Sequence, residues 1–384
     1  MEIITGDAIE LRKMIDSAYR KSRKCRSSIS KFAMADYISQ LHDLHNLMTG
    51  SNDELDQLRC LGSYRKTKKY YEYIDSLFDR LDENFVRYKK FHNEMFGQII
   101  DIHDEGLSKF WGSEYSSGST DMTKEEFFEY FFEFLKQYKL ENMFDRFISN
   151  KRIFNRPFSS EEKFYGSCLQ EPFGSDTLIS FCDFHYSLPY LITLAHEFGH
   201  VYDLAKLKGD ALPKKSMNYY YTSAYGEVVS MMFEKLFYDY LFDKKYRIKQ
   251  VRDLSIDYHF ANRQNVMAMY ILTLLSDEMI WNDPGEIDRN IMLQRVSHFF
   301  ENDEEISWFI GVRDFDTWKD QVYSYGEVIS TILKENVKKE GLNSQLMASF
   351  MNGRCNTFHP DFMLNNGFVP ESYQKVYSKD ISRL

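Results

Sequence analysis

Apolar residues recur every three or four positions through most of the chain, which is the spacing of amphipathic helices. The first such stretch covers residues 8–48 and is interrupted near Ser27 and Ser28. A second runs over residues 64–111, and helical spacing resumes from about residue 223 to the end. The pattern therefore predicts a mainly α-helical protein.

One zone departs from this spacing and is typical of strands. Residues 164–170 and 177–184 are β-prone, and they flank turn-forming residues at 171–176. We expect a hairpin or two strands of a small sheet. The next apolar run follows Ser187, a residue type that commonly caps helices, and continues to Val201. The small sheet should therefore lie directly before a helix in the chain.

The composition of the 384 residues is that of an ordinary globular protein, with 43% hydrophobic and 28% charged residues. Lysine and arginine number 48 and aspartate and glutamate 58, so the formal net charge is −10. Proteins that bind nucleic acids usually carry a basic balance, so this class is disfavoured. No segment approaches the roughly 20 apolar residues that span a bilayer, and we expect no membrane partner.

The five cysteines are irregularly spaced and odd in number, which fits free thiols in a reducing compartment. The first seven residues turn polar at once and contain no signal-peptide core. We therefore expect a cytoplasmic protein, although export without a signal peptide would leave no mark on the sequence. Nothing in the sequence predicts the oligomeric state.

One short motif carries candidate chemistry. His196 and His200 stand four residues apart in an apolar helical segment, and Glu197 follows the first histidine, giving the spacing HExxH. Positions i and i+4 share a helix face, so both imidazoles can bind one metal ion. Zn²⁺ suits two imidazoles and a carboxylate and keeps one position for water, on which Glu197 could act as general base. Gly199, between the histidines, would let another element approach closely.

A third ligand is available 31 residues after His196. Glu227 and Glu234 share a helical face in a segment that is otherwise strongly apolar. Carboxylates in such a segment are costly unless they are paired or bind a metal. Glu227 as a ligand and Glu234 as the partner of a ligating histidine would account for both. Asp203, on the same face as the histidines, could also orient a ligand.

The same residues also fit an interpretation without a metal. The two histidines would then be partly buried side chains of an ordinary amphipathic helix. Glu234 would pair with Lys235 or with a surface arginine. The HExxH spacing alone also arises by chance. The metal hypothesis is therefore stronger because a second motif, around Glu227, supplies a third ligand.

Together the two motifs resemble the oligoendopeptidase F and thimet oligopeptidase family of zinc metallopeptidases. The match covers Thr193–His200 (TLAHEFGH) and Glu227–Glu234 (EVVSMMFE), and the likeness extends over about residues 90–384. Three further segments are similar to the family's Gly-containing strand, its Tyr-x-Tyr stretch and its glycine-containing tail: Gly166-Ser167-Cys168, residues 321–326 and residues 350–369.

The resemblance implies a zincin-like fold that is mainly α-helical, with a small β-sheet beside the HExxH helix and a central substrate channel. It divides the chain into an N-terminal helical segment, 1–90, and a catalytic domain, 91–384. The first is much shorter than in typical relatives, so a lid over the channel would be reduced or different. One zinc ion per chain would bind His196, His200 and Glu227, and the substrate would be a short peptide.

The resemblance also implies roles for single residues. Glu197 would take the proton of the zinc-activated water and pass it to the leaving amine. Tyrosine hydroxyls of the downstream stretch would stabilise the oxyanion, with Tyr325 as first candidate and Tyr323 beside it. The strand at Gly166–Cys168 would bind the peptide backbone by strand addition.

Two departures from the family bear on substrate size and specificity. No histidine occurs between His298 and His359, where relatives often carry one, and position 203 is aspartate where many have histidine. We expect a zinc-dependent endopeptidase acting on oligopeptides. Two alternatives stay open: an inactive relative that binds peptides or a protein partner, and a zinc carboxypeptidase in which Arg313 captures the terminal carboxylate. The intact Glu197 disfavours the first.

Overall fold

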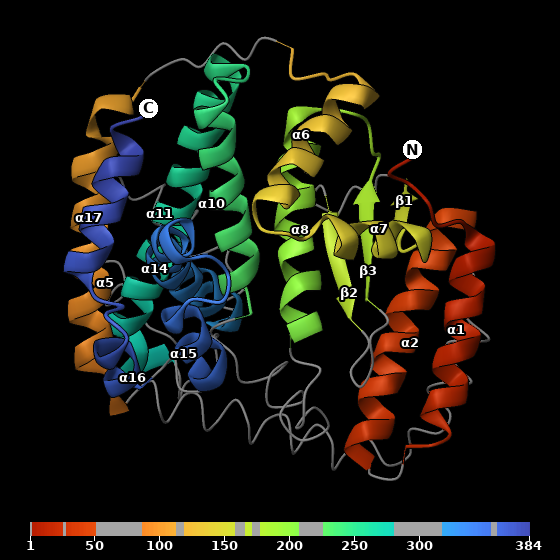
Figure 1. Ribbon diagram of the computed structural model, residues 1–384. Helices are drawn as coiled ribbons and strands as arrows, with labels where there is room; N and C mark the ends of the chain where they lie inside the picture. Colours follow the sequence, from red (N-terminus) through yellow and green to blue (C-terminus); the bar gives the residue numbers. More distant parts are fainter. Residues whose placement is uncertain are drawn as a thin grey trace. The chain divides into compact units, whose positions relative to one another are not determined.

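The chain is mainly α-helical with a small three-stranded sheet, as the sequence predicts (Figure 1). The computed structural model describes residues 2–25, 28–50, 87–112, 119–157, 166–170, 177–206, 226–279, 317–354 and 359–384. Close contacts divide the chain into two compact units. The first consists of Met1–Leu77, Ser117–Tyr221 and Val229–Val251, and the second of Phe78–Ser116, Thr222–Val228 and Arg252–Leu384. The boundary expected between residues 90 and 91 stays a prediction, since residues 51–86 lie outside the described part.

The first unit contains the sheet, whose strands follow the order β1–β3–β2. Strands β2 (Gly166–Gln170) and β3 (Thr177–Cys182) form an antiparallel pair, as expected from the sequence. Strand β1 (Ile153–Arg156) pairs in parallel with the other side of β3. Strand β1 was not predicted, because four residues are too few for an alternating pattern to stand out. Strand β2 is therefore an edge strand of the described sheet.

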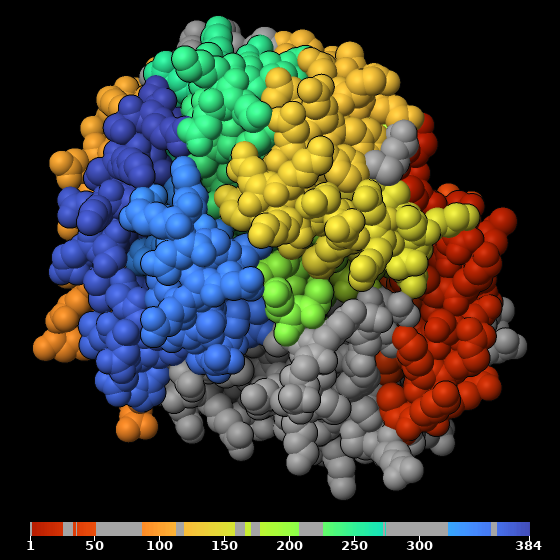
Figure 2. Space-filling model, viewed as in Figure 1, coloured from red at the N-terminus to blue at the C-terminus, as the bar shows by residue number. Residues whose placement is uncertain are grey.

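Helices cover both faces of this sheet. The hairpin of α1 (Ala8–Ser22) and α2 (Ser28–Thr49) packs on one face, where Leu169 of β2 joins its core. The interruption predicted near Ser27 and Ser28 falls where α2 begins, at Ser28. Gly166, three residues before Leu169, faces the helix α8 (Leu188–Lys206) on the other side. The outer sides of α1 and α2 form part of the surface, coloured red in Figure 2.

Phenylalanine rings make up much of the remaining core of this unit. They come from α6 (Lys124–Gln137), α7 (Glu141–Ser149), α8 and α10 (Val228–Asp243). Helix α6 begins with a capping box formed by Thr123 and Glu126. The rings meet mostly edge to face, which is a favourable arrangement of aromatic quadrupoles. This aromatic core holds α8 and α10 in place.

The second unit is a helical assembly. Its described elements are α5 (Lys89–Leu107), η2 (Ser108–Phe110), most of α11 (Ile248–Met279), α14 (Thr317–Glu340), α15 (Gln345–Gly353), α16 (Pro360–Asn365) and α17 (Pro370–Ile381). Among the described helices, none combines the length and apolar character that a membrane span requires.

Buried polar pairs connect the helices of the second unit. The Tyr373 hydroxyl of α17 donates to Glu327 Oε1 of α14 at 2.8 Å, and it lies 2.8 Å from His103 Nε2 of α5. Seven residues further along both helices, Lys334 Nζ of α14 lies 2.6 Å from both carboxylate oxygens of Asp380. The equal spacing on both helices shows that α14 and α17 run in the same direction.

Replacing Asp380 by Asn should lower the free energy of unfolding by about 3 kcal/mol. The Lys334 side chain is only 2% exposed, so its buried ammonium would lose a carboxylate that binds it through both oxygens. Lys379→Gln is the matched control, because its bond to Glu335 in the same helix pair is exposed and should contribute less than about 1 kcal/mol. Urea unfolding of both variants measures the two values, and equal losses would contradict this assignment.

Candidate metal centre

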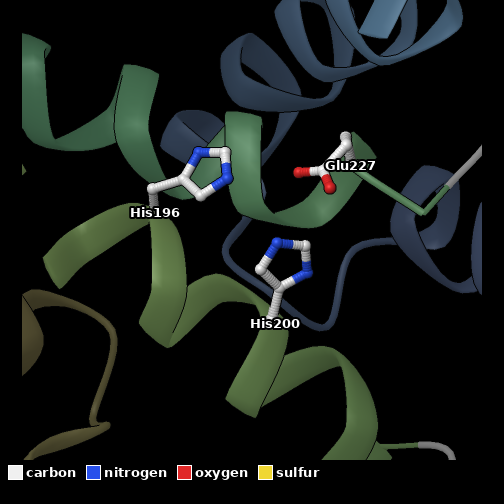
Figure 3. Close-up of side chains that lie close together, drawn as sticks. All are labelled: His196, His200 and Glu227. Carbon is white, nitrogen blue, oxygen red and sulfur yellow. The ribbon is translucent and has the colours of Figure 1, made fainter. Parts of the chain in front are cut away.

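Three predicted ligands come together in the structure. His196 and His200 extend from neighbouring turns of α8, and Glu227 stands directly before the first residue of α10 (Figure 3). One ligand atom of each side chain lies within 4.8 Å of those of the other two. Within the described ranges, no other group of three or more His, Cys, Asp or Glu side chains has this spacing. The arrangement suits a single metal ion.

Aromatic packing turns the two histidines toward this point. Phe198 lies between them in sequence, on the opposite face of α8. Its buried ring meets Phe144 of α7, Phe131 of α6 and Phe233 of α10, with ring centroids 5.5, 6.1 and 6.2 Å away. Since Phe198 is fixed in the core, the imidazoles must leave the helix on the other side. Their ring centroids are 5.3 Å apart.

Glu234 binds the first histidine. Its Oε2 lies 2.9 Å from Nδ1 of His196, and it stands two turns after Glu227 on the α10 side of the site. A carboxylate at this distance accepts a hydrogen bond from Nδ1–H and so fixes the tautomer and the orientation of the ring. The lone pair of the other nitrogen, Nε2, is then available for a metal. The structure thus brings Glu234 to the side chain that the sequence assigns to it.

Two further carboxylates of α8 are buried. Glu197 is 5% exposed, although it follows His196 directly and would be solvated on a surface helix. Asp203 is buried one turn after the second histidine. Burial, followed by the charge of Asp203, raises the pKa of the neighbouring Tyr202 to about 12. The roles of Glu197 as general base and of Asp203 as an orienting group stay predictions.

The edge strand β2 lies directly beside the helix that carries the histidines. A Cβ atom on Gly166 would lie 2.8 Å from the Thr193 side chain, one turn before His196. Ser167 and Cys168, the other residues predicted to bind substrate, follow on the same strand and are half-buried. Glycine at position 166 therefore lets β2 lie this close to α8 without a shift of the Thr193 side chain. That these residues bind a peptide stays a prediction.

The two candidate tyrosines lie on α14 in the second unit. Tyr325 is 0% exposed, and its hydroxyl lies 2.6 Å from Nδ1 of His92 on α5. Burial raises the pKa of Tyr325 well above its ordinary value, so the phenol keeps its hydrogen. Tyr323 is half-buried. Their role toward an oxyanion stays a prediction, and Arg313, the candidate of the carboxypeptidase alternative, lies outside the described residues.

Two solved structures are similar to the chain. A "putative peptidase" from Chlamydophila abortus shares 12% identity, with a TM-score of 0.48 over 84% of this chain and 59% of the other. A "putative oligoendopeptidase F" from Bacillus anthracis str. Ames shares 11% identity, with a TM-score of 0.49 over 91% of this chain and 66% of the other. The chain thus spans less than two thirds of either protein. No family model and no curated protein sequence matches it.

Glu234→Gln should weaken zinc binding by about 10- to 100-fold, because the amide is a poorer acceptor for the His196 ring and no longer fixes its tautomer. Competition with a chelator measures the affinity. Glu133→Gln is the control, since Glu133 bonds Lys244 at the surface and has no contact with the histidines. Unchanged zinc affinity in Glu234→Gln would remove this residue from the metal centre.

Proposed function

We propose that the protein is a zinc-dependent endopeptidase that hydrolyses oligopeptides. The observation that carries the proposal is the convergence of His196, His200 and Glu227, with ligand atoms within 4.8 Å of one another. Two imidazoles and one carboxylate form a common catalytic zinc site, in which the fourth position holds water. The HExxH spacing adds a carboxylate that is not a ligand, and this favours hydrolysis over a purely structural metal site.

The residues present fit a zinc ion by their chemistry. All three donors are nitrogen or oxygen atoms suited to Zn²⁺, and the His196–Glu234 bond leaves one imidazole nitrogen for the metal. When bound, zinc polarises the scissile carbonyl and lowers the pKa of its water to about 7. One ion per chain follows from the single group of ligands in the described part.

In this mechanism Glu197 moves the proton. Its carboxylate takes a proton from the attacking water and transfers it to the nitrogen of the leaving amine. The buried position of Glu197 suits such a base, since a site closed to bulk water strengthens electrostatic interactions with the reacting atoms. Glu234 holds the His196 ring during this cycle and exchanges no proton with the substrate.

The substrate would be an extended peptide that adds to the edge strand β2. Residues 166–168 lie on this edge, so their backbone groups can pair with a peptide as a neighbouring strand does. Such pairing recognises the backbone and accepts many side chains. This part of the proposal includes the zincin-like fold and the central channel.

A reducing compartment is part of the same proposal. Cys25, Cys168 and Cys182 are free thiols in the structure. The proposal that the protein works in the cytoplasm rests on the irregular spacing and odd number of its cysteines.

Glu197→Gln should keep its zinc and lose about 10²- to 10⁴-fold in turnover, because the base is removed and the ligands remain. The measurement is mass spectrometry of a mixed peptide library, with free and amidated C-termini, together with the zinc content of the protein. His196→Ala is the companion variant and should lose the metal itself. Internal cleavage of both peptide types is expected, and turnover by Glu197→Gln at the wild-type rate would exclude this mechanism.

Tyr325→Phe should lower the free energy of unfolding by about 1–3 kcal/mol, since the buried bond to His92 is lost. If the hydroxyl also stabilises the oxyanion, kcat falls further while KM stays nearly constant. Tyr323→Phe serves as comparison, because it removes the neighbouring hydroxyl and keeps the His92 bond. Thermal unfolding and steady-state kinetics separate the two effects. Wild-type stability of Tyr325→Phe would show that the buried bond contributes nothing.

A further inference from the structure

Helices α8 and α10 touch through their backbones at Gly199. A Cβ atom added to this glycine would lie 2.6 Å from the Cα of Ser230, 2.9 Å from the carbonyl oxygen of Val229 and 3.1 Å from the amide nitrogen of Ser230. At Gly6, Gly97, Gly106, Gly166 and Gly353, by contrast, the atoms that an added Cβ would meet belong to side chains. A side chain can rotate away, but a helix backbone cannot. The two helices therefore approach this closely because residue 199 has no side chain.

This contact lies among the residues of the metal centre. On α8, Gly199 stands between His196 and His200. On α10, Ser230 comes three residues after Glu227 and four before Glu234. Residues three and four apart share a helix face, so the contact borders the faces that carry the proposed ligands and the carboxylate bonded to His196. The separation of the two helices at this contact therefore sets the distance between the histidines and Glu227.

We propose that the contact between Gly199 and the backbone of residues 229–230 is the positioning device of the metal centre; the inference rests on the proposed zinc site. An ordinary Cβ contact begins at 3.4 Å, so a methyl group at position 199 would have to move α10 by about 0.8 Å from its present 2.6 Å. Zinc–ligand distances tolerate deviations of about 0.2 Å. A glycine at this position is thus required for the geometry of the ligands, in addition to the packing of the helices.

Gly199→Ala tests the proposal by its metal affinity. Zinc affinity, measured by competition with a chelator, should fall by at least about tenfold. Affinity for the larger Cd²⁺ ion should fall less, because longer bonds suit a wider site. The zinc-to-cadmium affinity ratio of the variant, relative to wild type, therefore separates a change in ligand spacing from a general loss of stability. An unchanged ratio, or unchanged zinc affinity, would overturn the proposal.

Gly97→Ala is the matched control. It makes the same substitution inside a helix, but its new methyl group would meet the ring of Tyr270 at 3.2 Å. Because that ring can shift, zinc and cadmium affinities should stay at wild-type values. If Gly97→Ala lost as much zinc affinity as Gly199→Ala, the loss would not depend on the contact at Gly199, and the proposal would be overturned.

A double variant tests whether the backbone makes the contact. Adding Ser230→Gly to Gly199→Ala removes the serine side chain and keeps the backbone atoms in place, so zinc affinity should not recover. Recovery would overturn the proposal. If Gly199→Ala does not fold without metal, its refolding is titrated with Zn²⁺ and with Cd²⁺. The zinc-to-cadmium affinity ratio from these titrations should again be lower than in wild type. A wild-type protein that binds no zinc would refute the proposed function itself.

Discussion

The metal centre depends on the cost of burying polar groups in two apolar helices. Helices α8 and α10 lie in an aromatic core, and most of their side chains are buried and hydrophobic. A carboxylate or an imidazole in such surroundings is costly unless it finds a partner. In this chain these groups are gathered where the two helices meet: two histidines, Glu227 and Glu234 come together instead of being spread over both surfaces. A hydrogen bond between His196 and Glu234 satisfies part of this requirement, and a metal ion would satisfy the rest.

The second unit meets the same requirement in a different way. There the buried polar groups bond to one another across helices, as His92 does with Tyr325 and as His103, Tyr373 and Glu327 do in a chain. In the candidate metal centre, the side chains of His196, His200 and Glu227, which are common metal ligands, point toward one another. This difference in geometry distinguishes a polar network that connects helices from a site that can hold an ion.

Much of the fold and of the candidate site follows from local sequence patterns. The i, i+4 spacing of His196 and His200 is sufficient to place both on one side of a helix, and the apolar surroundings of Glu227 make it a candidate ligand. Pairings between distant segments leave no such pattern. The bond between His92 and Tyr325 joins residues 233 positions apart, and strand β1 is defined only by its partner β3. Ser187 stands directly before α8, as expected, and its carbonyl accepts a hydrogen bond from the Leu191 amide, but its buried hydroxyl makes no capping hydrogen bond.

X-ray absorption at the zinc edge of the purified protein tests whether His196, His200 and Glu227 bind a zinc ion. We expect about one zinc ion per chain, bound to nitrogen and oxygen atoms at about 2.0–2.2 Å, with the outer-shell scattering of two imidazoles. His200→Ala should reduce the imidazole scattering or abolish binding. A first shell with sulfur at about 2.3 Å, or a protein that retains no zinc after purification in its presence, would contradict the account.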